Sequence, residues 1–304
     1  MKKVLLILMC CMAIQSVHAQ DTPKWADKAK KAVFSIVTYD KENKIKNTGN
    51  GFYIDNNGTA LSDYSLFEDA ERAVIINADG KELPVTRIAG ANSMYDVIKF
   101  RTETEKKITA LKVATQPAAV GETVYLLPYS TQKAATCQTG KVTQVDTIAD
   151  KAYYYTLTMT TSDKTVSCPI MNANGEVLGL IQKSASEEDK ESYAIGASYG
   201  ESLSISPLSA NDINLNKIGI AKALPETEDQ ALVYLYMSSS QMDAKNYLAT
   251  LNDFLQAYPN STEGYTRRAG YYMNIGDDEH NALAEADLKK AMDVSGNKTE
   301  GQYN

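Results

Sequence analysis

Short apolar segments separated by hairpin turns are the feature of this sequence that most restricts its fold. Asn56-Asn57-Gly58, Asp79-Gly80 and Asn174-Gly175 are turn signals, because Asn-Gly and Asp-Gly pairs accept the positive φ angles of tight hairpins. Many short strands joined by such turns predict a sandwich or a barrel rather than an α/β sheet. The expected strands are 32–39, 50–55, 72–78, 83–89, 95–101, 123–128, 140–145, 153–160, 170–172, 176–181 and 193–196. The polar stretch 183–191 is expected to be a solvated loop.

The pattern changes after Leu224-Pro225, where apolar residues take up helical spacing. One helical stretch is predicted over 229–258, and a second begins at 262, pauses at 276–278 and resumes to 292. The predicted organisation is therefore a leader over 1–19, a β-rich domain over 20–224 and a helical region over 225–304. The boundary itself is placed near 222–228.

The first 19 residues have the layout of a secretory signal peptide. Two lysines precede an apolar run over 4–14, and Val17-His18-Ala19 fits a cleavage site. The run is too short to favour a membrane-spanning helix. Met9 is a poor residue before a lipidated cysteine, so lipid attachment at Cys10 or Cys11 is not expected. We therefore expect an exported protein without a spanning segment in the mature chain.

Charge and composition exclude several classes of function. Cleavage would leave 29 basic and 38 acidic residues, a net charge of −9, which argues against nucleic acid or an anionic membrane as a partner. We find no cluster of metal ligands, no phosphate-binding glycine loop and no basic groove, so no cofactor and no metal are predicted. The mature chain keeps Cys137 and Cys168, which are interpreted equally well as one disulfide or as two buried thiols.

Six segments in order resemble the HtrA-like branch of trypsin-like peptidases, over roughly residues 32–200. They are 32–37 (AVFSIV), 49–54 (GNGFYI), 58–64 (GTALSDY), 78–84 (ADGKELP), 95–100 (YDVIKF) and 169–179 (PIMNANGEVLG). The resemblance implies a mainly β fold, the trypsin-like double β-barrel, followed here by an α-helical, repeat-like segment. It also favours a bacterial periplasm as the place of action.

The catalytic positions implied by the resemblance are degenerate. The family's histidine falls at Ser65, its aspartate at Asp96 and its nucleophile at Val166, while the two glycines that follow the nucleophile are Ser167 and Cys168. The chain has two histidines, one in the leader and one in the helical region, so none is available to the barrels. Without an imidazole a serine stays a weak nucleophile. Asp96 then needs another hydrogen-bond donor, and Ser65 is our structural prediction for it.

Two other interpretations of this region stay open. In the first, chemistry is rebuilt on Ser167 or Cys168, with Lys164 as the partner of Ser167. In the second, the barrel only supports the helices, which do the binding. The main prediction is an inactive peptidase homologue that binds a protein or peptide, and the alternative is an active endopeptidase with a non-standard site. Nothing in the sequence sets an oligomeric state.

Residues 262–292 resemble a tetratricopeptide repeat. The matching residues are Tyr265, Ala269, Tyr272, Gly276-Asp277, Ala284, Leu288 and Ala291. Repeats of this kind bury their apolar faces by stacking. One clear unit and one weaker unit are present, which is fewer than such repeats need for stability. The pair is therefore expected to pack against the β domain or to be part of a longer array. A plain helical hairpin is the alternative. His280 is expected to be a surface residue at the turn or early in the second helix.

Overall fold

The structure is a computed structural model that describes residues 22–104, 108–149, 152–183 and 191–301. Twelve strands form two closed six-stranded barrels, with the strand orders β1-β2-β3-β6-β5-β4 and β10-β11-β12-β9-β8-β7. The first barrel comprises β1 (Val33–Tyr39), β2 (Ile45–Tyr53), β3 (Thr59–Ser62), β4 (Arg72–Ile76), β5 (Glu82–Asn92) and β6 (Val97–Thr102). The second comprises β7 (Thr123–Leu126), β8 (Gln138–Ala149), β9 (Ala152–Leu157), β10 (Pro169–Met171), β11 (Val177–Ile181) and β12 (Ser192–Gly196).

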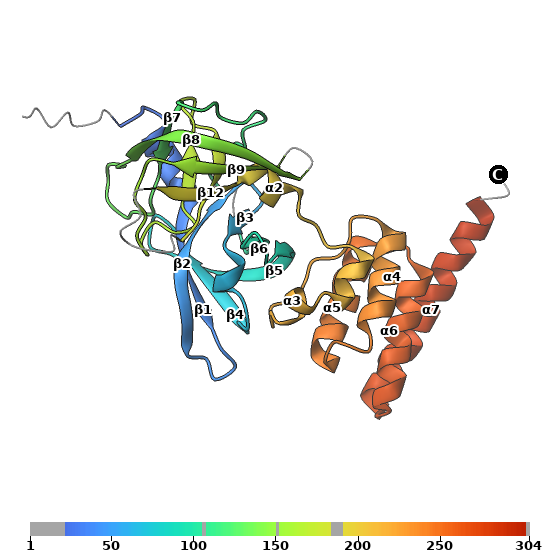
Figure 1. The fold of residues 1–304 in the computed structure, drawn as a ribbon. Coiled ribbons are helices and arrows are strands. Elements are labelled where there is room, and N and C mark those ends of the chain that lie inside the picture. The colour runs from blue at the N-terminus through green and yellow to red at the C-terminus, as the bar shows by residue number, and fades with distance from the viewer. Residues whose placement is uncertain (1–21, 105–107, 150–151, 184–190, 302–304) are drawn as a thin grey trace, which may run out of the picture.

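Seven α-helices are described, and most lie after the barrels. They are α1 (Ala26–Ala29), α2 (Ala197–Ser202), α3 (Ile213–Asn216), α4 (Glu228–Ser238), α5 (Ala244–Ala257), α6 (Thr262–Ile275) and α7 (Asp278–Gly301). Three short 3-10 turns lie at Lys30–Ala32, Tyr64–Leu66 and Pro207–Asn211. Figure 1 shows α4 to α7 standing side by side next to the first barrel. The predicted fold class, a double barrel followed by helices, is confirmed.

Each barrel encloses its own apolar interior. Inward residues alternate with outward ones along the strands, as in β1, where Phe34 and Ile36 are fully buried. Phe52, Leu61 and Phe100 complete much of the first core, and the second is built around residues such as Leu126, Leu157, Ile170 and Ile181. Hydrophobic burial on this scale is the main term that stabilises the barrels.

Every strand expected from the sequence overlaps a strand of the structure, with ends displaced by a few residues. The Asn-Gly turn after β2 forms as predicted, because Asp55 Oδ1 accepts hydrogen bonds from the N–H groups of Asn57 and Thr59. The predicted strands do not include the short strand β3, which at four residues is too short to give a clear alternating pattern. The leader over 1–19 and most of the loop 183–191 lie outside the described residues.

The single helix predicted over 229–258 is wrong, since two helices form there. Asp243 accepts a hydrogen bond from Asn246 N–H and so caps a new helix start after α4 has ended. The second helical stretch divides at Gly276, which has a φ of 77° and ends α6. Glycine meets no Cβ penalty in this left-handed region, so the predicted interruption falls where expected.

The helical region is attached to the first barrel by backbone and side-chain contacts. Ile88 on β5 donates to Ala221 O and accepts from Ala223 N–H, at 2.8 and 2.7 Å, so the connecting segment adds a short parallel pairing to that strand. Arg87 pairs with Asp253 on α5 at 2.5 Å. The buried Tyr234 of α4 joins the core of the first barrel. These contacts place α4 and α5 against the barrel; the division at 224/225 stays a prediction.

Candidate functional site

The site implied by the resemblance lies where the two barrels meet. Ser65 comes from the 3-10 turn after β3, and Asp96 precedes β6, so both belong to the first barrel. Residues 164–168 precede β10 of the second barrel. Asn50 of β2 joins the two sides, because its amide Nδ2 donates to Lys164 O at 3.1 Å and to Val166 O at 2.9 Å. The degenerate positions are therefore brought to one place.

Asp96 is satisfied by the residue at the histidine position. Ser65 donates its backbone N–H to Asp96 Oδ1 at 2.6 Å and its hydroxyl to Asp96 Oδ2 at 3.0 Å. The predicted Ser65–Asp96 hydrogen bond is present. Asp96 itself adopts a φ of 47°, a left-handed conformation that aspartate tolerates better than most residues. The Ser65 hydroxyl thus hydrogen-bonds the carboxylate that would hold the imidazole in an intact triad.

The turn at the nucleophile position forms, but its amides are used internally. The N–H groups of Thr165 and Val166 both donate to Ser162 O, at 2.8 and 3.2 Å. Ser167 takes a φ of 63°, which a Cβ-bearing residue adopts at a cost of about 1–2 kcal/mol. An oxyanion site requires amide donors aimed at a point where a substrate oxygen can lie. The Val166 N–H is instead directed to a neighbouring carbonyl.

Ser167 and Cys168 are both fully buried. Burial, with a smaller contribution from the nearby Asp63 charge, raises the pKa of the Cys168 thiol to about 12. Within the described residues the Ser167 hydroxyl has no hydrogen-bond partner. The Ser167–Lys164 hydrogen bond required by a serine–lysine site is therefore absent there, and the Lys164 side chain is exposed.

Asp63 is a buried carboxyl group that sequence reasoning did not single out. It is 1% exposed, and its Oδ1 has no hydrogen-bond partner among the residues described. Burial raises the pKa of Asp63 well above its usual range, and the charge of Asp96 raises it further. The Ser167 hydroxyl lowers this pKa, although it is not placed to make a well-formed hydrogen bond. Asp63 lies two residues before Ser65, between β3 and the 3-10 turn, and no local sequence signal marks it as buried.

A family model for the trypsin-like peptidase domain matches residues 49–180. The chain contains a trypsin-like peptidase domain. The matched segment of this peptidase domain contains Ser65, Asp96 and Val166, and the two barrels agree with its fold. No curated protein matches the chain. Membership of the HtrA-like branch stays a prediction.

Cys137 and Cys168, which both lie in the matched segment of the peptidase domain, are separate thiols and do not form a disulfide. Burial raises the pKa of Cys137 to about 11. No group of three or more His, Cys, Asp or Glu residues is placed to hold a metal ion in the part of the chain that the structure describes. Across those same residues, no helix combines the length and the apolar character needed to span a bilayer.

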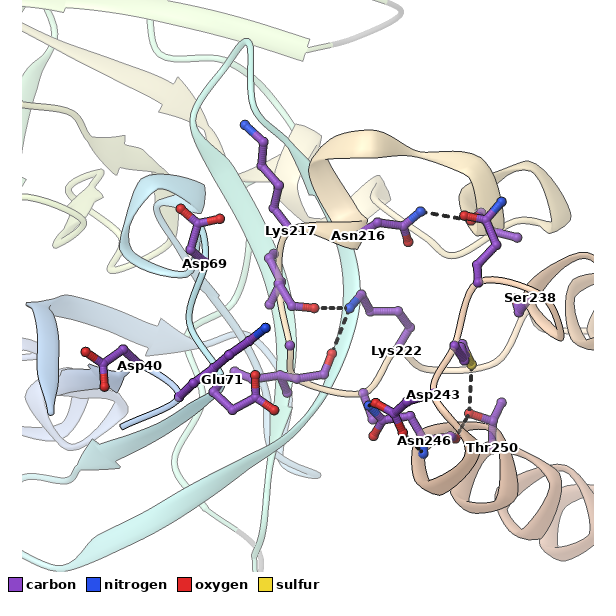
Figure 2. A pocket seen from close by; sticks show the side chains of 18 of the residues that line it. Asp40, Asp69, Glu71, Asn216, Lys217, Lys222, Ser238, Asp243, Asn246 and Thr250 are labelled. Carbon is purple, nitrogen blue, oxygen red and sulfur yellow. Dashed lines mark hydrogen bonds between the residues drawn. The ribbon is translucent and has the colours of Figure 1, made fainter. Parts of the chain in front are cut away.

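A large cavity lies away from the degenerate centre. Its volume is about 780 Å³, and it opens between the first barrel, the segment 216–222 and the helices α4 and α5. Figure 2 shows Lys222 in its middle, with Asp40, Asp69 and Glu71 on the barrel side and Ser238 and Asp243 on the helical side. None of Ser65, Asp96 or Val166 lines it. The degenerate catalytic centre and this cavity thus lie in different places.

Proposed function

We propose that the chain is an exported, non-hydrolytic member of the trypsin-like peptidases that binds proteins or peptides. One observation carries the proposal: a serine and a valine occupy the base and nucleophile positions, and the Val166 amide donates to Ser162 O instead of facing a substrate oxygen. The base, the nucleophile and one expected oxyanion donor are therefore all unavailable for peptide-bond hydrolysis.

Each replacement removes a separate chemical step. The Ser65 hydroxyl does not accept a proton near neutral pH and is already donated to Asp96. Val166 has no lone pair with which to attack a carbonyl carbon. Loss of a single oxyanion donor typically lowers turnover by about 10²–10³-fold in an intact enzyme. When members of the triad are missing, the hydrolysis that remains depends on the oxyanion hole. Little hydrolysis is therefore expected here.

The alternative, an active peptidase using Ser167 or Cys168, has less support. Both residues are fully buried, so a substrate carbonyl cannot reach them without rearrangement. The raised pKa of the thiol, about 12, leaves almost no thiolate near neutral pH. A serine nucleophile of this kind needs a neutral amine as its base. The ionisable group that interacts with Ser167 is instead the carboxyl group of Asp63, whose pKa is raised.

The helical region offers a second surface for partners. Exposed large apolar side chains lie on these helices, namely Val233, Tyr236, Met273, Ile275, Leu283, Leu288 and Met292. Exposed apolar side chains contribute to protein contact sites where they form a contiguous patch. The small residues Ala269, Ala284 and Ala291 are buried, which supports close packing of α6 and α7 as in a tetratricopeptide hairpin. We therefore include these helices in the proposed binding role.

Export to the periplasm is also part of the proposal. It rests on the order of lysines, apolar run and small-residue end in the first 19 residues. Expression of the chain in a bacterium, followed by fractionation and N-terminal sequencing, tests it. A mature N-terminus at Gln20 in the periplasmic fraction is expected. An uncleaved chain in the cytoplasmic fraction would refute this element alone.

Reduced casein tests binding and hydrolysis together. A photoreactive amino acid is placed at Ser65 in one sample of the whole chain and at Met292 in another, which compares the cleft with the helices. We expect crosslinks to intact casein and no fragments. The proposal fails if casein is cleaved and the Asp96→Asn variant abolishes the cleavage. Covalent labelling of Ser167 or Cys168 by a peptidase probe would support the alternative instead.

A further inference from the structure

The cavity between the first barrel and the helices has the size and the walls of a ligand site. Its volume of about 780 Å³ falls within the range of small-molecule pockets, roughly 300–1,000 Å³. Three parts of the chain line it: the turn between β1 and β2 with residues 69–71, the connecting segment 216–222, and α4 with α5. The pairing of Ile88 with residues 221–223 fixes the connecting segment against β5.

Lys222 places a confined ammonium group in this cavity. Its Nζ donates to Ile220 O at 2.8 Å and to Ile218 O at 2.5 Å (Figure 2). Burial lowers the pKa of Lys222 to about 8, and the charge of Glu71 acts in the opposite direction. Among the described residues no carboxylate lies within salt-bridge distance of this amine. Confined charges normally have a charged partner, and an ammonium has three donors, so one N–H remains for an anionic oxygen.

Ser238 supplies a second polar group on the helical wall. The residue is 1% exposed, it lines the cavity, and its hydroxyl has no hydrogen-bond partner in the described part of the chain. Burial raises the pKa of Tyr234, and a hydrogen-bonding interaction with the Ser238 hydroxyl lowers it, although the two hydroxyl groups do not make a well-formed hydrogen bond. Leaving a buried hydroxyl unpaired costs about 1–3 kcal/mol. A ligand oxygen at this wall would remove that cost.

The barrel wall carries more carboxylates than ammonium groups. Asp40, Glu42 and Glu71 line the cavity and make no salt bridge among the described residues. Lys46 and Asp69 pair with each other at 3.9 Å, and Lys217 pairs with Glu68 at 2.7 Å, so those two lysines are already engaged. Lys41 also lines the cavity, in the turn between Asp40 and Glu42. The lining holds five carboxylates and four ammonium groups in total. A purely anionic or purely cationic ligand would face like charges on one wall.

We propose that this cavity binds a small zwitterion, whose carboxylate pairs with Lys222 and Ser238 and whose ammonium group faces the carboxylates Glu71, Asp40 and Glu42 on the side of the first barrel. The free amino acid and the carboxyl end of a short peptide share this chemistry. Because the ligand would touch both the barrel and the helices, binding would also hold the two against each other. This site is separate from the degenerate centre and goes beyond the proposed function.

Calorimetric titration of the whole chain tests the site. The probes are L-lysine, the tripeptide Ala-Ala-Lys, its C-terminal amide, and N-acetylglycine, which has a carboxylate but no ammonium group. We expect at least one zwitterion to bind, and the amide and N-acetylglycine to bind at least tenfold more weakly. If L-lysine binds more tightly than the tripeptide, the ligand is a free amino acid. If the tripeptide binds more tightly than L-lysine, the ligand is the carboxyl end of a peptide.

Variants separate the role of the cavity from general surface charge. Lys222→Met and Ser238→Ala are expected to weaken zwitterion binding by at least tenfold and by several-fold, respectively. Lys289→Met, which removes an exposed lysine of α7, serves as the matched control and should bind normally. If Lys222→Met does not fold by circular dichroism, Ser238→Ala and Glu71→Gln carry the test. Equal binding of the amide, unchanged affinity in the folded variants, or no binding of any probe would overturn the proposal.

Discussion

Replacing Asp63 by asparagine gives a sharp test of the electrostatics at the old centre. The residue is 1% exposed, and its Oδ1 has no partner among the described residues. Burial and the Asp96 charge both raise its pKa in the folded protein, whereas the unfolded chain ionises near the ordinary value of 3.8. The folded state therefore holds a proton that the unfolded state loses as the pH increases.

The sign of the pH effect follows from this difference in proton binding. The stability associated with protonated Asp63 is complete below pH 3.8 and is lost as the pH rises toward the folded pKa. Asparagine has the same shape and does not titrate, so Asp63→Asn should be nearly as stable as the wild type at pH 4. At pH 8 it should be more stable, by about 1.4 kcal/mol for each tenfold decrease that folding causes in the acid dissociation constant of Asp63.

Thermal unfolding followed by circular dichroism between pH 4 and 8 measures the effect. Each kcal/mol corresponds to a rise of about 2–4 °C in Tm for a chain of this order of size. Asp79→Asn, in the exposed turn after β4, is the matched control and should show no gain that grows with pH. A variant no more stable than wild type at pH 8, or one whose advantage is larger at pH 4, would refute the reasoning.

Three further predictions concern the nucleophile turn, the helices and the buried thiol. The double variant Ser65→His with Val166→Ser should still not cleave casein, because the amide of residue 166 remains directed at a carbonyl; clear hydrolysis would show that the turn is usable. Asp287→Ala should lower the free energy of unfolding in urea by about 2–4 kcal/mol. Arg268 donates two hydrogen bonds to the Asp287 carboxylate, and the variant would leave its half-buried guanidinium without this charged partner. An unchanged midpoint would contradict this. Cys168 should resist thiol reagents at pH 8 until denaturant is added, since at a pKa of about 12 only about one thiol in ten thousand is ionised; rapid labelling of the folded protein would mean that the loop opens.

Much of the fold could be predicted because its signals are local. The Asn-Gly and Asp-Gly turns and the alternation in segments such as Val33–Tyr39 depend on neighbours within a few residues. The helix start at Asp243 was missed even though its capping signal is also local. Apolar residues on both sides of it continued the helical spacing and obscured the cap.

The candidate site was only partly predictable. The positions of Ser65, Asp96 and Val166 follow from the order of motifs, and the Ser65–Asp96 hydrogen bond followed from the need of a carboxylate for a donor. The burial of Asp63 could not be predicted, because the atoms that enclose it come from distant segments such as the loop before β10. The same holds for Lys222, whose surroundings combine a barrel turn, a connecting segment and two helices.

The sequence by itself determined which chemical groups are present at the old catalytic positions: a hydroxyl, a carboxylate and an isopropyl side chain, with no imidazole between the leader and the helices. Only the tertiary structure decided where the amide of Val166 points, which carboxyl group is kept from water, and that a cavity of mixed charge opens beside Lys222. Residue identity sets what a group can donate or accept, whereas its pKa and its partners depend on segments that meet only after folding.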